Sequence, residues 1–173
     1  MKKSTYIKYI ATAALAALLA ATLISCGSGD KGTEGETQET QQIHNAAYTL
    51  NINGQELQPG IEMPDNLGEP TSYFEAPSCA IEGLDKNYTY GSILVITEDD
   101  GKTERITTMT ILDDGAATRN GITIGDSKDK VLSIYGATSK ATETSLTYTF
   151  DTVTVKFLLR DGCVTSITYS IAE

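Results

Sequence analysis

The chain has 173 residues, with 13 Lys and Arg against 23 Asp and Glu, a formal net charge of −10 and no Trp. So acidic a surface repels phosphate backbones, which argues against nucleic acid as a partner. The length allows one compact domain or two very small ones.

The first 26 residues are typical of a lipoprotein signal. Three lysines stand among the first eight residues, and residues 10–24 follow without a charge. The small residue Ser25 comes directly before Cys26, which predicts a signal peptide over residues 1–25 that ends in a lipobox. An apolar run of ~15 residues is shorter than the ~20 that span a bilayer. We therefore expect a lipid on Cys26 to hold the mature protein on the extracytoplasmic face of a cell membrane.

Residues 26–45 are rich in Gly, Ser, Thr, Glu and Gln and contain a single aliphatic side chain, Ile43. Such a segment cannot bury enough surface to fold, so we predict a flexible acidic tether. The only histidine, His44, lies in it. Catalytic triads that need an imidazole base are therefore excluded from the folded part.

Two cysteines, Cys79 and Cys163, remain in a compartment that permits disulfides. A bond between them is one interpretation, and two separate buried thiols are the other. The sequence does not decide whether their Cα atoms approach to the ~6 Å that a disulfide needs.

The folded part divides into two similar halves, residues 46–118 and 119–173. Tyr88-Thr-Tyr90 in the first half corresponds to Tyr148-Thr-Phe150 in the second, and the Asp100-Gly101 turn corresponds to Asp161-Gly162. Alternating apolar residues around each Asp-Gly pair predict antiparallel hairpins.

Each half also begins with a predicted short helix. In the second half a polar start at residues 126–129 and a stop at Gly136 enclose an apolar face. In the first half the helix is shorter, between Gly60 and Gly68, with Pro64 inside it. The predicted fold class is therefore α+β: two tandem repeats, each a helix plus an antiparallel meander, that share one curved sheet with the helices on one side.

The Gly-Ile-x-Ile-Gly-Asp-Ser … Val-Leu-x-x-Tyr-Gly stretch at residues 121–136 resembles the repeat of the β-lactamase inhibitor protein and of small SmpA/OmlA (BamE-like) envelope lipoproteins. Residues 67–90 are similar to uncharacterised lipoproteins of Gram-positive anaerobes. The first resemblance implies a helix-then-sheet unit, often in tandem, with a concave sheet that grips a protein partner. The second implies no activity.

Carboxylate pairs occur at Asp99-Asp100 and Asp113-Asp114, but both pairs precede glycines and are typical of polar turns. No segment has the spacing of an EF-hand loop, and zinc lacks Cys and His ligands. We therefore predict no catalytic residues, no metal site and no cofactor.

The tyrosines suggest a different role, since tyrosine is enriched at the energetic centres of protein interfaces. The candidate partner-binding face comprises Tyr73, Phe74, Tyr88, Tyr90 and Tyr148. The alternative is that most of these rings fill the core. The predicted function is a non-catalytic, lipid-anchored protein-binding module whose partner lies in the envelope or medium. A binder of a cell-wall glycan or peptide is the alternative, and a small envelope hydrolase is a third.

Overall fold

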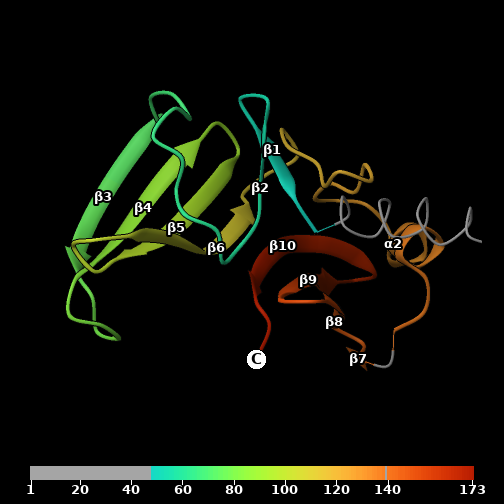
Figure 1. Cartoon of the computed structure of the whole chain (residues 1–173). Helices are drawn as coiled ribbons and strands as arrows, with labels where there is room; N and C mark the ends of the chain where they lie inside the picture. Colours follow the sequence, from blue (N-terminus) through green and yellow to red (C-terminus); the bar gives the residue numbers. More distant parts are fainter. Residues whose placement is uncertain (1–47, 139) are drawn as a thin grey trace, which may run out of the picture. The chain divides into compact units, whose positions relative to one another are not determined.

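The computed structural model describes residues 48–138 and 140–173 (Figure 1). The predicted signal peptide over residues 1–25, the lipidation site Cys26 and the tether over residues 26–45 lie outside the described residues. No helix in the described ranges is long and apolar enough to cross a membrane.

Antiparallel strands dominate the described residues. A two-stranded hairpin comes first, made of β1 (Leu50–Ile52) and β2 (Gln55–Leu57). An eight-stranded sheet follows, in the order β3-β4-β5-β6-β10-β9-β8-β7. Its strands are β3 (Ser72–Pro77), β4 (Leu84–Tyr90), β5 (Ile93–Asp99), β6 (Glu104–Ile111), β7 (Lys140–Ala141), β8 (Ser145–Phe150), β9 (Val153–Arg160) and β10 (Cys163–Ile171).

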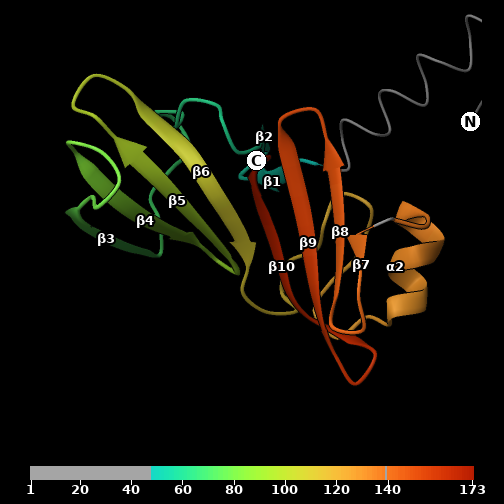
Figure 2. The same ribbon diagram turned by 90° about the horizontal axis from the view of Figure 1, so that it is seen from below.

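The sheet consists of two groups of four strands. β3 to β6 come from the first half of the folded part and β7 to β10 from the second. They join only through β6 and β10, whose register pairs Ile111 with Ile167 at one end and Thr108 with Ser170 at the other. In Figure 2, β6 and β10 meet at this seam and then diverge. The internal-repeat interpretation stays a prediction.

One face of the sheet carries the core. A continuous cross-strand row illustrates it, because each member lies directly opposite the next. In order from β8 to β3 the row is Tyr148, Val155, Tyr169, Met109, Val95, Tyr88 and Tyr73. The five members from Tyr148 to Val95 are buried, whereas Tyr73 at the far end is 48% exposed.

Among the described residues, hairpin β1–β2 and helix α2 (Lys128–Tyr135) each cover a part of this face. Hairpin β1–β2 buries Leu50, Ile52 and Leu57 in the core and lies beside β6 and β10 in both views (Figures 1 and 2). Helix α2 lies beside β7 and β8. The Ser127 side chain caps the helix by accepting the Lys130 N–H at 3.2 Å.

The predicted hairpin turns are confirmed. Asp161 and Gly162 adopt φ of 52° and 76°, the left-handed geometry of a tight turn between β9 and β10. The turn around Asp100-Gly101 likewise joins β5 to β6, with Gly101 at φ 80°.

The predicted α+β fold class, by contrast, is wrong. Half of the helical layer is missing, because residues 61–67 form no helix and α2 is the one helix that residues 48–138 and 140–173 contain. The protein is mostly β.

The physical reason lies in the backbone of the segment that connects β2 to β3. Gly60 N–H donates to Ile106 O at 2.7 Å, and Met63 N–H donates to Glu104 O at 2.9 Å. The segment thus runs extended beside the start of β6. Pro59, Pro64 and Pro70 have no N–H that could bond within a helix, so the backbone of this segment pairs with β6 instead.

Candidate functional site

Three tyrosines lie together at the β3–β4 end of the core face, and we call them the tyrosine row: Tyr73, Tyr88 and Tyr90. Tyr73 and Tyr88 face each other across the two strands, with ring centroids 5.0 Å apart. Tyr88 and Tyr90 alternate along β4, and their rings lie 6.5 Å apart at an interplanar angle of 18°. The row offers aromatic faces and hydroxyls at the surface rather than a sealed core.

An ion-pair network lies beside the tyrosine row. Lys86 is two residues before Tyr88 on β4, so both side chains point to the same face. Its Nζ lies 2.7 Å from Asp99 Oδ2 and 2.9 Å from Glu104 Oε2. Thr97 Oγ1 donates to the other Glu104 oxygen at 2.6 Å. This network fixes β4, β5 and β6 together at their ends.

The contacts within the network shift the pKa values of Lys86 and Glu104 so that both side chains stay charged. The hydrogen bond to Asp99 raises the pKa of Lys86, although burial opposes the shift. Burial alone would raise the pKa of Glu104, but hydrogen bonds, that of Thr97 foremost, leave it lowered. Burial, and then the contact with Glu104, raises the pKa of the Tyr88 hydroxyl. None of these groups is poised to exchange protons near neutral pH, which disfavours acid–base catalysis.

A cavity of about 470 Å³ opens between the tyrosine row and the segment that connects β2 to β3. Tyr88 and Tyr90 form one wall. Four carboxylates and one lysine also line it: Glu62, Asp65, Glu69, Glu104 and Lys102. An aromatic wall with an excess of carboxylates suits a cationic group better than an anionic one.

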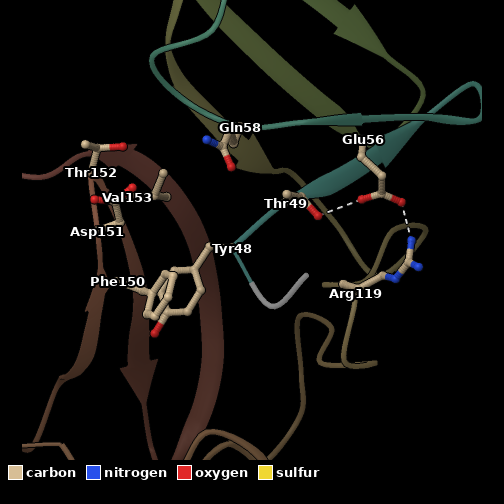
Figure 3. Close-up of a pocket in the computed structure, with 9 residues that line it drawn as sticks. All are labelled: Tyr48, Thr49, Glu56, Gln58, Arg119, Phe150, Asp151, Thr152 and Val153. Carbon is tan, nitrogen blue, oxygen red and sulfur yellow. Dashed lines mark hydrogen bonds and ion pairs between the residues drawn. The ribbon is translucent and has the colours of Figure 1, made fainter. Parts of the chain in front are cut away.

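A second cavity, of about 330 Å³, lies between hairpin β1–β2 and the end of β8 (Figure 3). The rings of Tyr48 and Phe150 stack at 5.5 Å on one side of it. On the other side, Glu56 accepts a hydrogen bond from Thr49 at 2.6 Å and pairs with Arg119.

Both oxygens of the Glu56 carboxylate make contacts within the fold. Burial alone would raise the pKa of Glu56, but hydrogen bonds from Thr49 and Asn51 and the Arg119 charge lower it. Its contacts tie hairpin β1–β2 to the loop that precedes α2. We therefore assign this cavity a structural role.

The structure brings together three of the five residues of the candidate binding face. Tyr73, Tyr88 and Tyr90 form the tyrosine row. Phe74 follows Tyr73 directly in β3, so it points to the opposite face, where it is 61% exposed. Tyr148 is only 7% exposed, and its hydroxyl donates to Gly136 O at 2.8 Å. Phe74 and Tyr148 therefore do not belong to the same surface as the row.

The candidate disulfide is not formed, because Cys79 and Cys163 are both free. Cys79 follows β3 at the edge of the sheet, while Cys163 begins β10, four strands away. Four strand spacings amount to roughly 19 Å, far beyond the ~6 Å between bonded cysteines. The alternative of two buried thiols is also wrong, since both side chains are exposed.

The paired carboxylates are turn residues, as predicted. Asp100 Oδ1 accepts the N–H groups of Lys102 and Thr103, both at 2.8 Å. Asp113 Oδ1 accepts the Gly115 N–H at 2.8 Å. Among residues 48–138 and 140–173, no group of three or more His, Cys, Asp and Glu side chains is arranged to hold a metal ion.

Sequence reasoning missed the Lys86 network. The period of two along β4 was a usable signal, because it places Lys86 on the same face as Tyr88 and Tyr90. Its partners Asp99 and Glu104 flank the β5–β6 turn, and only the strand register brings them to Lys86.

No family model matches the chain, nor does any curated protein or solved structure.

Proposed function

We propose that this protein is a non-catalytic binding module that the lipid on Cys26 holds on the extracytoplasmic face of a cell membrane. It engages a protein partner through the tyrosine row. The signal-like sequence of residues 1–26 supports the location.

The exposure of the tyrosine row is the observation that carries the binding role. Tyr73, at the end of the cross-strand row, is 48% exposed, and Tyr88 beside it is partly buried. The other members of that row are buried. Large aromatic side chains cost free energy in water and recover it at an interface, where tyrosine is enriched. The contacts among the three rings also restrict their orientation before a partner arrives, which lowers the entropic cost of binding.

Capture in the native cells tests this function. Tagged full-length protein is crosslinked at the cell surface and purified under stringent conditions, in parallel with the Tyr73→Ala and Tyr73→Ala/Tyr88→Ala variants. We expect one dominant protein partner, reduced at least ten-fold in the double variant. Leu158→Ala is the matched control, because Leu158 is 41% exposed on β9 and points away from the core face. Equal capture by all four proteins would refute the role of the tyrosine row.

The cavity beside the row supports a second candidate function, a binder of a small cationic ligand or peptide. Its volume of about 470 Å³ is within the usual range for ligand sites. Glu69→Gln removes one lining carboxylate and leaves the tyrosine row unchanged. Loss of binding in Glu69→Gln but not in Tyr73→Ala would favour this candidate over the protein-binding module.

A further inference from the structure

The two edges of the eight-stranded sheet differ in their protection. Natural edge strands avoid pairing with other chains by being very short, or by carrying Lys, Pro or a bulge. β7 has two residues, and one of them is Lys140. β3 has six residues, contains no lysine, pairs with β4 without a register shift, and has its proline only at the end. Among the described residues, β3 is therefore the edge that remains open to another strand.

The backbone register shows which groups of β3 are open. Ser78, just past β3, donates its N–H to Gly83 O at 3.0 Å in the same register that β3 keeps with β4. In an antiparallel pair, alternate residues direct their N–H and C=O toward the neighbouring strand. Ser78 is even-numbered, so the backbone N–H and C=O groups of the even-numbered β3 residues face β4. Those of the odd-numbered residues face outward. The N–H and C=O groups of Tyr73 and Glu75 therefore point away from the sheet.

Those two residues carry a specific chemistry. Glu75 lies directly opposite Lys86 on β4, but the Lys86 ammonium is held at 2.7 and 2.9 Å by Asp99 and Glu104. The Glu75 carboxylate instead accepts a hydrogen bond from the Tyr73 hydroxyl. Thus the cation that the register sets across from Glu75 is bound elsewhere, and the outer side of Glu75 is open.

The net negative charge of residues 48–112, which include β3, also favours a basic partner strand. Residues 48–112 contain 11 Asp and Glu against three Lys and Arg, whereas residues 113–173 contain eight against six. A strand that adds to β3 therefore meets a strongly acidic surface. A second copy of the chain would bring the same negative charge to that surface, which disfavours self-pairing.

We propose that a protein partner adds one extended strand to the outer edge of β3, and that this strand places Lys or Arg opposite Glu75 and an aromatic or β-branched residue opposite Tyr73. The inference rests on the proposed function, since it requires a protein partner. Tyr73 and Glu75 are two residues apart, so the two complementary side chains are also two apart in the partner. The recognised segment is then apolar–x–basic, in one direction or the other, with the backbone supplying the remaining contacts.

Amide hydrogen exchange tests the strand addition directly. NMR is recorded on the full chain in detergent micelles. The probe is a ten-residue Lys–Val peptide of repeating Val-Val-Lys-Lys, in which each Lys lies two residues from a Val and so on the same face of the strand. We expect exchange at the Tyr73 and Glu75 amides to slow at least ten-fold, with no slowing at Phe74 and Ala76, which already bond to β4. A Glu–Val peptide of the same repeat, with Glu in place of each Lys, is the control and should leave all four amides unchanged.

Three results would overturn the proposal. One is unchanged exchange at both outward amides with millimolar Lys–Val peptide. Another is equal protection by the Glu–Val peptide. The third is protection without any peptide that grows with protein concentration, which would assign the edge to a second copy of the chain.

A matched pair of variants separates this proposal from the proposed function. Glu75→Pro removes an outward N–H without removing a bond to β4, and edge strands tolerate proline at such positions. Glu75→Ala removes the same carboxylate and keeps the N–H. In the cell-surface capture we expect Glu75→Pro to lose the partner at least five-fold beyond Glu75→Ala.

Failure of strand addition and failure of the proposed function give different results in the capture experiment. Loss of the partner in Tyr73→Ala/Tyr88→Ala together with equal capture by Glu75→Pro and Glu75→Ala would refute strand addition and leave the binding module standing. Retention of the partner in all variants would refute both the tyrosine row and strand addition, and capture of no partner by the unaltered protein would refute the binding module itself. If Glu75→Pro fails to fold, the exchange measurement on the unaltered chain decides.

Discussion

At the β8 end of the sheet, the cross-strand row ends in Tyr148, and at the β3 end it ends in Tyr73. Helix α2 covers the first end, where its Tyr135 lies 5.2 Å from Tyr148 and 5.1 Å from Phe157, centroid to centroid. No helix among the described residues covers the second end, where the rings of its tyrosines contact one another. Similar side chains in the same row are therefore core at one end and surface at the other, and the covering element decides which.

The largest expected effect is the difference in stability between Tyr148→Ala and Tyr73→Ala. Tyr148 is buried against two rings, so its truncation should lower the free energy of unfolding by about 3 kcal/mol. Tyr73→Ala should lower it by less than about 1 kcal/mol, because the ring is half exposed. Urea unfolding followed by circular dichroism measures both. Equal losses would show that covering by α2 does not distinguish the two ends of the cross-strand row.

The ion-pair network at the uncovered end should make stability depend on pH. The lowered pKa of Glu104 means that its contribution is present above the ordinary value of 4.5 and is lost as the pH falls through the folded-state value. Glu104→Gln should cost about 2 kcal/mol at pH 7, as expected for a charged hydrogen-bonded group. It should also flatten the loss of stability below pH 4.5. Urea titrations between pH 3 and pH 7 test both statements, with Glu143→Gln, an exposed residue outside the network, as the control.

A smaller effect is expected at the start of the covering helix. Ser127→Ala removes the side chain that accepts the Lys130 N–H, which should destabilise α2 by about 1 kcal/mol. Hydrogen exchange should speed up in α2 and leave the β3–β4 hairpin unchanged. Ser127→Asp keeps an acceptor at the cap and should restore the protection. Faster exchange in both regions would show that the two ends are not independent.

The smallest effect belongs to the exposed ion pair between the β2–β3 connection and β6. Arg105 Nη2 lies 3.5 Å from Glu62 Oε1, and both side chains are more than half exposed. Arg105→Ala should change the free energy of unfolding by less than about 0.5 kcal/mol, because surface pairs are screened. A loss above 1 kcal/mol would mean that this pair, rather than the backbone bonds to β6, holds the connection in place.

The sequence predicted local features where a single residue type decides the geometry. The Asp161-Gly162 turn is an example, since both residues adopt positive φ. The polar helix start predicted at residues 126–129, where Ser127 is the cap, and the stop predicted at Gly136 were equally local. The predicted helix over residues 61–67 failed because its glycine boundaries resembled those of the true helix, while the competing partner, β6, lies about 40 residues away in the chain.

The candidate site was predicted only in part for a similar reason. Alternation along β4 correctly grouped Tyr88 with Tyr90. The same rule separates Phe74 from Tyr73, since consecutive strand residues point to opposite faces. Tyr148, however, has the same local pattern as Tyr88. Only the position of α2, which no local pattern reveals, distinguishes the buried ring from the accessible one.

The seam between β6 and β10 has a consequence for the order of events during synthesis. β6 ends at Ile111, but its partner β10 begins only at Cys163, the last of the described strands to leave the ribosome. Until then the β3–β6 group has two open edges, and only one of them is closed by the chain itself. A nascent chain that stalls before residue 163 would therefore expose β6 as a second template for pairing, and truncations in β10 should aggregate rather than merely lose stability.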